Sequence, residues 1–332
     1  MSAMPIIDDT KIRSSGKLEI VNPVGRRTIR YAIHDVDGTH SLIRDWPPVM
    51  SLVIHYAMTS GLPEDFDSEA ATRRLIESCG KEKLEETDRF CVESAGLSAL
   101  TQMEFGIRRA IELGNIPAAA GIRLTDEQRR NNARIIERMW HGQERFEDIP
   151  EPKELQTFVH ERTPRLFRLY ETVLNGFCRD RNTAAAWKNP EPWRVEGSLE
   201  FMRRLHELGC INYFVTGAVI YPEGGMHEEV CAVRFDIGPG KMVEAIEGSS
   251  WDRKMPKEEV MRELFKRLGA DPAEALVIGD GRTEIKAGVD QGCVTMSRLP
   301  LNASRQREMH RGFGVNYIVA DYTEPALEKL IR

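Results

Sequence analysis

The sequence lacks the features of a membrane, secreted or metal-cluster protein. No hydrophobic run approaches the roughly 18 residues of a membrane-spanning helix, and the first residues lack the apolar core of a secretory signal. The six cysteines form no C-x-x-C pair, and the eight histidines form no H-x-H or H-E-x-x-H pattern. We therefore expect a cytoplasmic protein with reduced cysteines and without a zinc cluster or a disulfide framework.

An excess of positive charge is also absent. The chain carries 46 Lys and Arg against 52 Asp and Glu, a net charge of −6. This balance gives no global attraction to nucleic acid or to an anionic membrane, so neither is expected as a partner. With 41% hydrophobic and 30% charged residues, the composition of the 332-residue chain is typical of a globular protein with a sizeable core.

The pattern of hydrophobic residues changes twice along the chain. Residues 45–194 have almost wholly helical patterns, whereas helical and strand patterns alternate from residue 195 onward. Alternation of this kind is typical of a parallel sheet with helices on both faces. We predict an α/β fold with a Rossmann-like three-layer core, formed by residues 17–44 and 195–332, and a separate α-helical domain formed by residues 45–194. Residues 1–16 are polar and patternless and are predicted to be a flexible tail.

Within the second half, two short runs alternate on either side of Gly238-Pro239-Gly240. These runs, residues 231–236 and 242–246, predict a β-hairpin. An amphipathic pattern predicts a helix over residues 257–268, and a buried apolar run predicts a strand over residues 275–278.

Polar residues follow three of the predicted strands directly. Asp35 and Asp37 end the first apolar run, and Thr216 and Asp280 end two later ones. Because ligands of parallel sheets bind outside the carboxyl ends of the strands, these residues are candidates for one site. Asp35 and Asp37 lie on the same side of an extended chain, where two like charges repel unless a cation neutralises them. Their hard oxygen atoms favour Mg2+, although an acidic turn after a buried strand is the alternative.

These residues resemble, in order, the four motifs of the haloacid dehalogenase superfamily, in its phosphatase branch. The first motif is residues 35–39, and the second is Thr216. The third is a lysine at a helix start, for which we prefer Lys257 over the alternative Lys254. The fourth is residues 279–284, Gly-Asp-Gly-Arg-Thr-Glu. A dinucleotide loop is a poor interpretation of this last stretch, because a glutamate stands where the third glycine would be.

The resemblance implies that the helical segment is a cap inserted after the first motif. It also implies a Mg2+-dependent phosphatase that hydrolyses a small phosphorylated metabolite, such as a sugar phosphate or a nucleotide, through an aspartyl-phosphate. Two alternatives stay open: a phosphomutase that uses the same intermediate, and a non-catalytic regulatory protein. The leaving group, the cap residues that set specificity and the pairing of two copies into a homodimer are not decided by the sequence.

The resemblance further assigns a role to each motif residue. Asp35 is the expected nucleophile, and Asp37 the expected general acid and base. Thr216 and Lys257 are expected to contact the phosphoryl group, unless the threonine only caps a turn or the lysine only faces solvent. The Mg2+ ligands implied are Asp35, Asp280 and the backbone carbonyl of Asp37.

Four further residues are candidates around this site. Glu284 is expected to orient metal-bound water or Lys257 rather than to bind metal itself. Gly217, His40 and Arg44 are candidates for contacting the substrate. Residues 41–44, Ser-Leu-Ile-Arg, also resemble a subgroup of sugar-cluster-associated phosphatases, in which a leucine usually follows the threonine of the first motif. This chain has His40 at that position, and the departure leaves the substrate class open.

Overall fold

The computed structural model describes residues 4–94, 97–116, 121–221, 224–250 and 255–332. The alternative motif lysine, Lys254, lies outside these ranges. Two compact units make up the chain. The first contains Met1–Ile43, Asn182–Ser250 and Met255–Arg332, and the second contains the continuous segment Arg44–Arg181. Among the described residues, no helix is long and apolar enough to cross a membrane.

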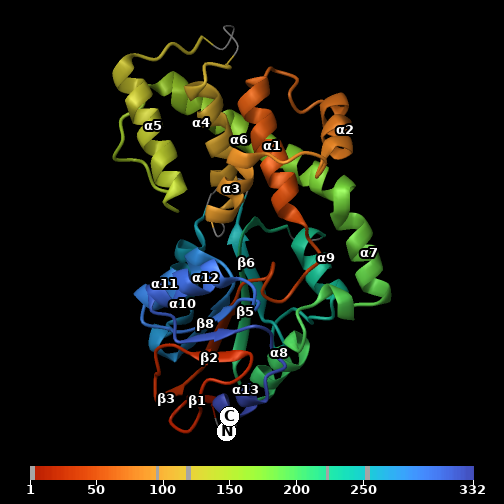
Figure 1. Cartoon of the computed structure of the whole chain (residues 1–332), viewed down its shortest axis with the longest axis vertical. Helices are drawn as coiled ribbons and strands as arrows, with labels where there is room; N and C mark the ends of the chain where they lie inside the picture. Colours follow the sequence, from red (N-terminus) through yellow and green to blue (C-terminus); the bar gives the residue numbers. More distant parts are fainter. Residues whose placement is uncertain (1–3, 95–96, 117–120, 222–223, 251–254) are drawn as a thin grey trace. The chain divides into compact units, whose positions relative to one another are not determined.

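A seven-stranded sheet forms the centre of the first unit, in the order β2-β9-β8-β7-β4-β5-β6 (Figure 1). Only β2 runs antiparallel, against β9, and the other neighbouring pairs are parallel. This arrangement confirms the predicted α/β class with a parallel sheet. The strands are β2 (Leu18–Ile20), β4 (Tyr31–His34), β5 (Ile211–Val219), β6 (Ala245–Ser249), β7 (Ala275–Gly279), β8 (Val294–Arg298) and β9 (Tyr317–Val319).

Helices cover both faces of this sheet, which gives the three predicted layers (Figure 1). On one face lie α10 (Lys257–Leu268), α11 (Arg282–Asp290) and α12 (Ser304–Phe313). On the other face α8 (Ser198–Glu207) and α13 (Pro325–Leu330) bury Phe201, Leu205 and Leu327 against the strands. Every residue of β4 and β7 is buried, as expected for strands that are covered on both faces, and His34 is the polar residue among them.

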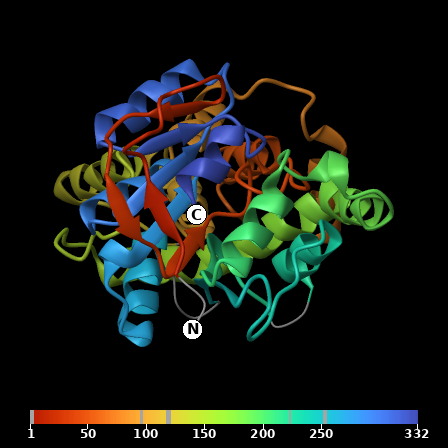
Figure 2. The ribbon, with the colours of Figure 1, turned by 90° about the horizontal axis from the view of Figure 1, so that it is seen from below.

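The predicted flexible tail is wrong for the part of residues 1–16 that the structure describes. Strand β1 (Ile6–Asp8) pairs antiparallel with β3 (Arg26–Thr28), and Ile7 is fully buried. The backbone of Ile6 also exchanges two hydrogen bonds with that of Arg332, so this ribbon lies beside the C-terminus (Figure 2). Composition misled the prediction, because a strand of three residues is too short to show an alternating pattern.

The predicted hairpin is also wrong. Residues 225–232 form helix α9, and β6 pairs in parallel with β5 instead of returning against a neighbouring strand. Met226 and Val230 are buried at helical spacing and pack with Phe235, which accounts for the helix. Over runs this short, apolar residues fit a helix and a strand almost equally well.

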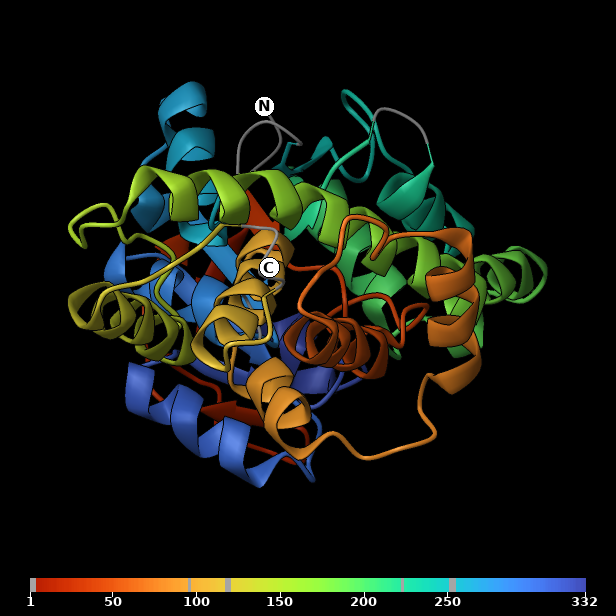
Figure 3. The same cartoon turned by 90° about the horizontal axis from the view of Figure 1, so that it is seen from above.

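The second unit is helical throughout its regular structure. Its helices are α1 (Trp46–Ser60), α2 (Glu69–Ser78), α3 (Glu85–Glu93), α4 (Ala99–Glu112), α5 (Asp126–Trp140) and α6 (Lys153–Leu174). Helix α6 packs along α1 and α4 (Figure 3), and α5 begins with a capping box between Thr125 and Gln128. Helix α7 (Asp180–Lys188) crosses into the first unit, which places the boundary at residue 181 rather than at the predicted residue 194.

Candidate active site

The candidate site lies where the course of the chain reverses across the sheet. After β4 the chain adds β5 and β6 on one side of it, and then adds β7, β8 and β9 on the other side. Such a switch point is the usual ligand site of an open parallel sheet. Asp35 is the first residue after β4, Asp280 is the first after β7, and Thr216 lies in β5 close to its carboxyl end.

A buried lysine holds two of the carboxylates at this site. The ammonium group of Lys257 donates to Asp35 Oδ1 at 2.7 Å and to Glu284 Oε2 at 3.1 Å. All three side chains are buried. Lys257 is the first residue of α10, as predicted, so the helix start delivers the lysine to the strand ends. The positive charge of Lys257 therefore lies directly beside Asp35, the residue expected to act as nucleophile.

Glycines of the fourth motif make room for Glu284. Its carboxylate accepts a 2.6 Å hydrogen bond from the backbone N–H of Gly281. A Cβ atom on Gly279 or on Gly281 would lie 2.4 Å or 2.7 Å from atoms of the Glu284 side chain. Side chains at either position would therefore push Glu284 away from Lys257. Glu284 reaches Lys257, one of the two roles expected for it.

Asp280 packs against the turn of the first motif. The chain has φ +74° at Gly38, and a Cβ there would lie 2.2 Å from Asp280 Oδ2. Thr39 donates its hydroxyl to Asp280 Oδ1 at 3.3 Å. The glycine thus permits both the left-handed turn and the close approach of the carboxylate.

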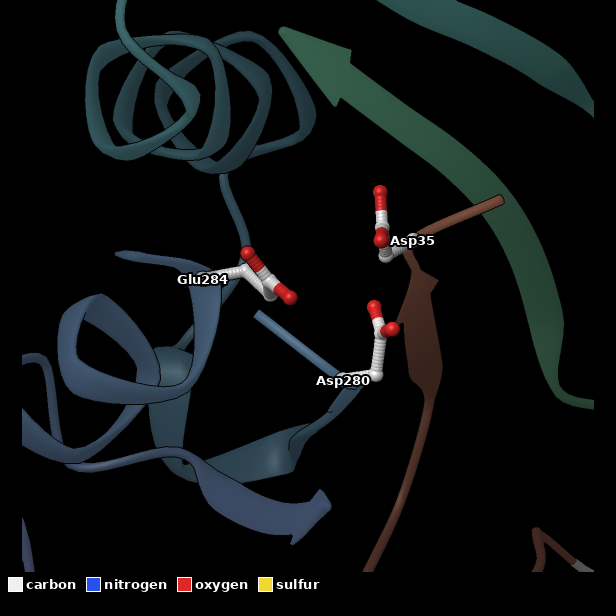
Figure 4. Close-up of side chains that lie close together, drawn as sticks. All are labelled: Asp35, Asp280 and Glu284. Carbon is white, nitrogen blue, oxygen red and sulfur yellow. The ribbon is translucent and has the colours of Figure 1, made fainter. Parts of the chain in front are cut away.

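The side chains of Asp35, Asp280 and Glu284 converge on one small space (Figure 4). One carboxylate oxygen from each lies within 4.8 Å of the others. Burial, together with the neighbouring carboxylates, raises the pKa of Asp35 well above its usual value and that of Asp280 to about 6. The pKa of Lys257 is raised, because the attraction of Asp35 and Glu284 outweighs the burial that opposes its charge.

This donor set fits a divalent cation. With all groups ionised, three carboxylates and one ammonium leave two negative charges, which a divalent cation neutralises. Both oxygens of Glu284 are already hydrogen-bonded, to Lys257 and to the N–H of Gly281, whereas Lys257 contacts only Oδ1 of Asp35. The carboxylates of Asp35 and Asp280 are therefore the more suitable ligands. Carboxylate oxygens alone favour Mg2+ over a transition metal.

Thr216 lies at an irregularity of β5. The pairing of β5 with β6 shifts register between Val215 and Val219, the stretch that contains Thr216. Thr216 Oγ1 accepts a 3.1 Å hydrogen bond from the backbone N–H of Ala218, so its hydroxyl does cap the local turn. Because the oxygen is the acceptor in this bond, the hydroxyl hydrogen can be donated elsewhere. The alternative role and the expected one are therefore compatible.

Asp37 has a carboxylate oxygen without a protein partner. The residue is half-buried, and its Oδ1 is buried yet makes no hydrogen bond within the described part of the chain. Buried oxygens are normally paired, so this atom is a point where an external group can bind.

The prediction for His40 needs correction, because its ring is fully buried. His34 and His40 form a 2.9 Å hydrogen bond between ring nitrogens, and His40 stacks on Tyr322 with ring centres 5.1 Å apart. The histidine is packed among aromatic rings of the core and exposes no surface for a ligand. Gly217 is buried in β5 beside Thr216, and Arg44 belongs to the second unit, so their contacts with substrate stay predictions.

Two residues that contact the first motif were not found from the sequence. Arg298 ends β8 and donates to the backbone carbonyl of Gly38 at 2.8 Å. Tyr322 follows β9 and donates its hydroxyl to the carbonyl of Thr39 at 3.1 Å. The rule that polar residues at strand ends form the site applies to Arg298 as well, but Tyr322 gives no such signal.

No family model matches this chain, and no curated protein matches it. Among solved structures it is similar to a predicted phosphatase from Clostridium acetobutylicum, at 14% identity over 91% of this chain and 98% of that chain, with a TM-score of 0.47. It is also similar to a β-phosphoglucomutase from Clostridium difficile, at 10% identity over 91% and 97%, with a TM-score of 0.47. A hydrolase from Pseudomonas syringae matches at 13% identity over 90% and 97%, with a TM-score of 0.46.

The strand order and the positions of the motifs come from the chain itself. Together they give an α/β fold with a mostly parallel sheet, in which residues of the first and fourth motifs follow the neighbouring strands β4 and β7.

Proposed function

We propose that the protein is a Mg2+-dependent phosphatase that hydrolyses a small phosphorylated metabolite, such as a sugar phosphate or a nucleotide. The observation that carries this proposal is the 2.7 Å contact between Lys257 and Asp35 at the end of the central strand, beside Asp280. A buried carboxylate, a fixed ammonium group and a second carboxylate supply the positioning and neutralisation that phosphoryl transfer requires.

In the proposed reaction, a carboxylate oxygen of Asp35 attacks phosphorus. The new oxygen–phosphorus bond forms as the ester bond breaks, and Asp37 gives its proton to the leaving oxygen. Asp37 then takes a proton from the water that attacks the aspartyl-phosphate, which regenerates both carboxyl groups and releases phosphate. Its unpartnered Oδ1 supports this role.

Thr216 and Lys257 stabilise the negative charge of the transferred group in this proposal. The threonine donates its hydroxyl hydrogen, and the lysine is held in place by Glu284. Asp35, Asp280 and the backbone carbonyl of Asp37 are the proposed Mg2+ ligands, and the bound ion supplies further neutralisation of the phosphoryl charge. Arg44 and Gly217 stay candidates for substrate contact.

The test is phosphate release from a panel of phosphorylated metabolites, with Mg2+ and with a chelator. We expect release by the wild type only with Mg2+, and loss of release by at least about 10³-fold in Asp35→Asn, because the nucleophile is lost. Asp290→Asn is a matched control, since Asp290 is an exposed carboxylate of α11 that pairs with Lys286. Its activity should equal that of the wild type.

Two results would contradict the proposal. A product that keeps its phosphoryl group, but at a different position from that in the substrate, would instead indicate a phosphomutase. No release from any metabolite, by folded protein that binds Mg2+, would favour the non-catalytic regulatory alternative.

A further inference from the structure

The turn of the first motif is held by two side chains from the far end of the sequence. The backbone carbonyls of Gly38 and Thr39 are consecutive, and each accepts a hydrogen bond from a different element. Arg298 Nη1 reaches the first carbonyl at 2.8 Å, and the hydroxyl of Tyr322 reaches the second at 3.1 Å. Both donors come from the strand ends on the β8 and β9 side of β4.

While Nη1 of Arg298 binds the Gly38 carbonyl, another nitrogen of the same guanidinium group stays without a partner among the described residues. Its Nε is buried and has no hydrogen-bond partner in the part of the chain that the structure describes. An unpaired buried donor is destabilising, and a side chain selected for stability alone would avoid it. The hydrogen bond of Arg298 to the Gly38 carbonyl therefore explains the position of its guanidinium group better than a contribution to stability does.

Tyr322 is fixed before it reaches the turn. Its ring lies between those of Phe201 and His40, with ring centres 4.7 Å and 5.1 Å away. A ring packed on both faces has little rotational freedom, so its hydroxyl points to one place. The buried His40 thus acts on the site through Tyr322.

The turn in question determines how the carboxylates approach one another. Gly38 packs directly on Asp280, and Thr39 donates its hydroxyl to the same carboxylate. Asp37 immediately precedes this pair. A shift of the Gly38 and Thr39 carbonyls would therefore move the proposed acid and base relative to the proposed metal ligand, and misplacement of catalytic groups by about 1 Å costs about 100-fold in rate.

We propose that Arg298 and Tyr322 are positioning residues, which fix the Gly38–Thr39 turn so that Asp37 and Asp280 are held in reacting geometry. The role in catalysis rests on the proposed phosphatase function. Neither residue contacts the transferred group, so both should affect the rate of the chemical step more than substrate binding.

The experiment compares the wild type with Arg298→Met and Tyr322→Phe, the second of which removes only the hydroxyl group. Amide hydrogen exchange of the segment 36–41 reports the turn without any substrate, because the N–H groups of Gly38, His40 and Ser41 are hydrogen-bonded inside it. We expect exchange there to become at least about fivefold faster in both variants. We also expect kcat to fall by about 10- to 100-fold with KM within about threefold.

Arg204→Met is the matched control, because Arg204 also braces backbone carbonyls, those of Glu328 and Ile331, but in another part of the first unit. It should leave both kcat and exchange of the 36–41 segment unchanged. Unchanged exchange in Arg298→Met and Tyr322→Phe would overturn the positioning role, and so would faster exchange with an unchanged kcat. Absence of phosphate release by the wild type would instead overturn the proposed function, and the exchange result would still decide whether the two residues hold the turn.

Discussion

At the scale of single residues, Gly38 shows how a backbone requirement and a packing requirement meet at one position. Its φ of +74° is unfavourable for any residue with a side chain, and the space beside it is filled by the Asp280 carboxylate. Gly25 has nearly the same φ, +73°, but has nothing within 4 Å of a Cβ placed there. A comparison of alanine substitutions at Gly38 and Gly25 therefore separates the effect of the unfavourable backbone conformation from the effect of the contact with Asp280.

We expect Gly38→Ala and Gly25→Ala each to lower the free energy of unfolding by about 1 kcal/mol, because both force alanine into the left-handed region. Only Gly38→Ala should also displace Asp280 and lower phosphate release by about 100-fold or more. Chemical unfolding and initial rates measure the two effects. Equal activity of the two variants would show that the contact with Asp280 has no catalytic importance.

At the scale of elements, the sequence indicated the site better than it indicated its surroundings. The apolar runs of β4 and β7 end in Asp35 and Asp280, so the positions of these strand ends were predictable from the order of apolar and polar residues alone. For Glu284 the sequence left two roles open, of which the ion pair with Lys257 is one. The sequence could not decide between them, because the two residues are 27 positions apart and meet only through the packing of α10 against α11. Arg298 stands at a strand end and could have been found by the same rule, but the backbone carbonyls that Arg298 and Tyr322 contact leave no signal in the sequence.

Strand β1 is an element that composition concealed, and its contribution to stability can be measured. Ile7 is fully buried in the core beneath the sheet and forms a bridge with Ile331, whereas Ile6 is only half-buried. We expect Ile7→Ala to lower the free energy of unfolding by about 2 to 5 kcal/mol, the usual cost of truncating a buried isoleucine. Ile6→Ala should cost clearly less. Equal small losses in chemical unfolding would restore the prediction of a loose tail.

Helix α12 brings a buried histidine to the end of β8. His310 is fully buried, and its Nδ1 lies 2.7 Å from the hydroxyl oxygen of Ser297. Burial lowers the pKa of His310 to about 4 from an ordinary value of 6.5. Below pH 6.5 the unfolded chain therefore binds a proton that the folded protein does not, so stability falls as the pH falls toward about 4.

We expect His310 to contribute about 1 kcal/mol of this loss per pH unit in that window. His310→Gln should accordingly show a shallower loss of stability than the wild type between pH 6.5 and pH 5, measured by urea unfolding. The exposed His227 provides the control, because His227→Gln should keep the wild-type slope. Parallel curves for the wild type and His310→Gln would contradict the assignment.

At the scale of the whole molecule, all the proposed metal ligands belong to one of the two units. Asp35, Asp37 and Asp280 lie in the first unit, which the chain leaves after Ile43 and enters again at Asn182. The second unit has its own buried residues, among them Phe90, Phe105 and Phe167. Two cores of this kind are expected to unfold in separable steps, and a ligand of one unit stabilises only the step in which its site is lost.

Calorimetric unfolding should therefore show two transitions, of which Mg2+ raises only one. At an Mg2+ concentration of 100 times the dissociation constant, the stabilisation of the first unit amounts to about 2.7 kcal/mol. Ile7→Ala identifies that transition, because it lowers the midpoint of the first unit alone, and Asp280→Asn should abolish the effect of Mg2+ on it. If Mg2+ instead raised the transition that Ile7→Ala leaves unchanged, the metal would bind in the second unit, and the carboxylates at the strand ends would not be its ligands.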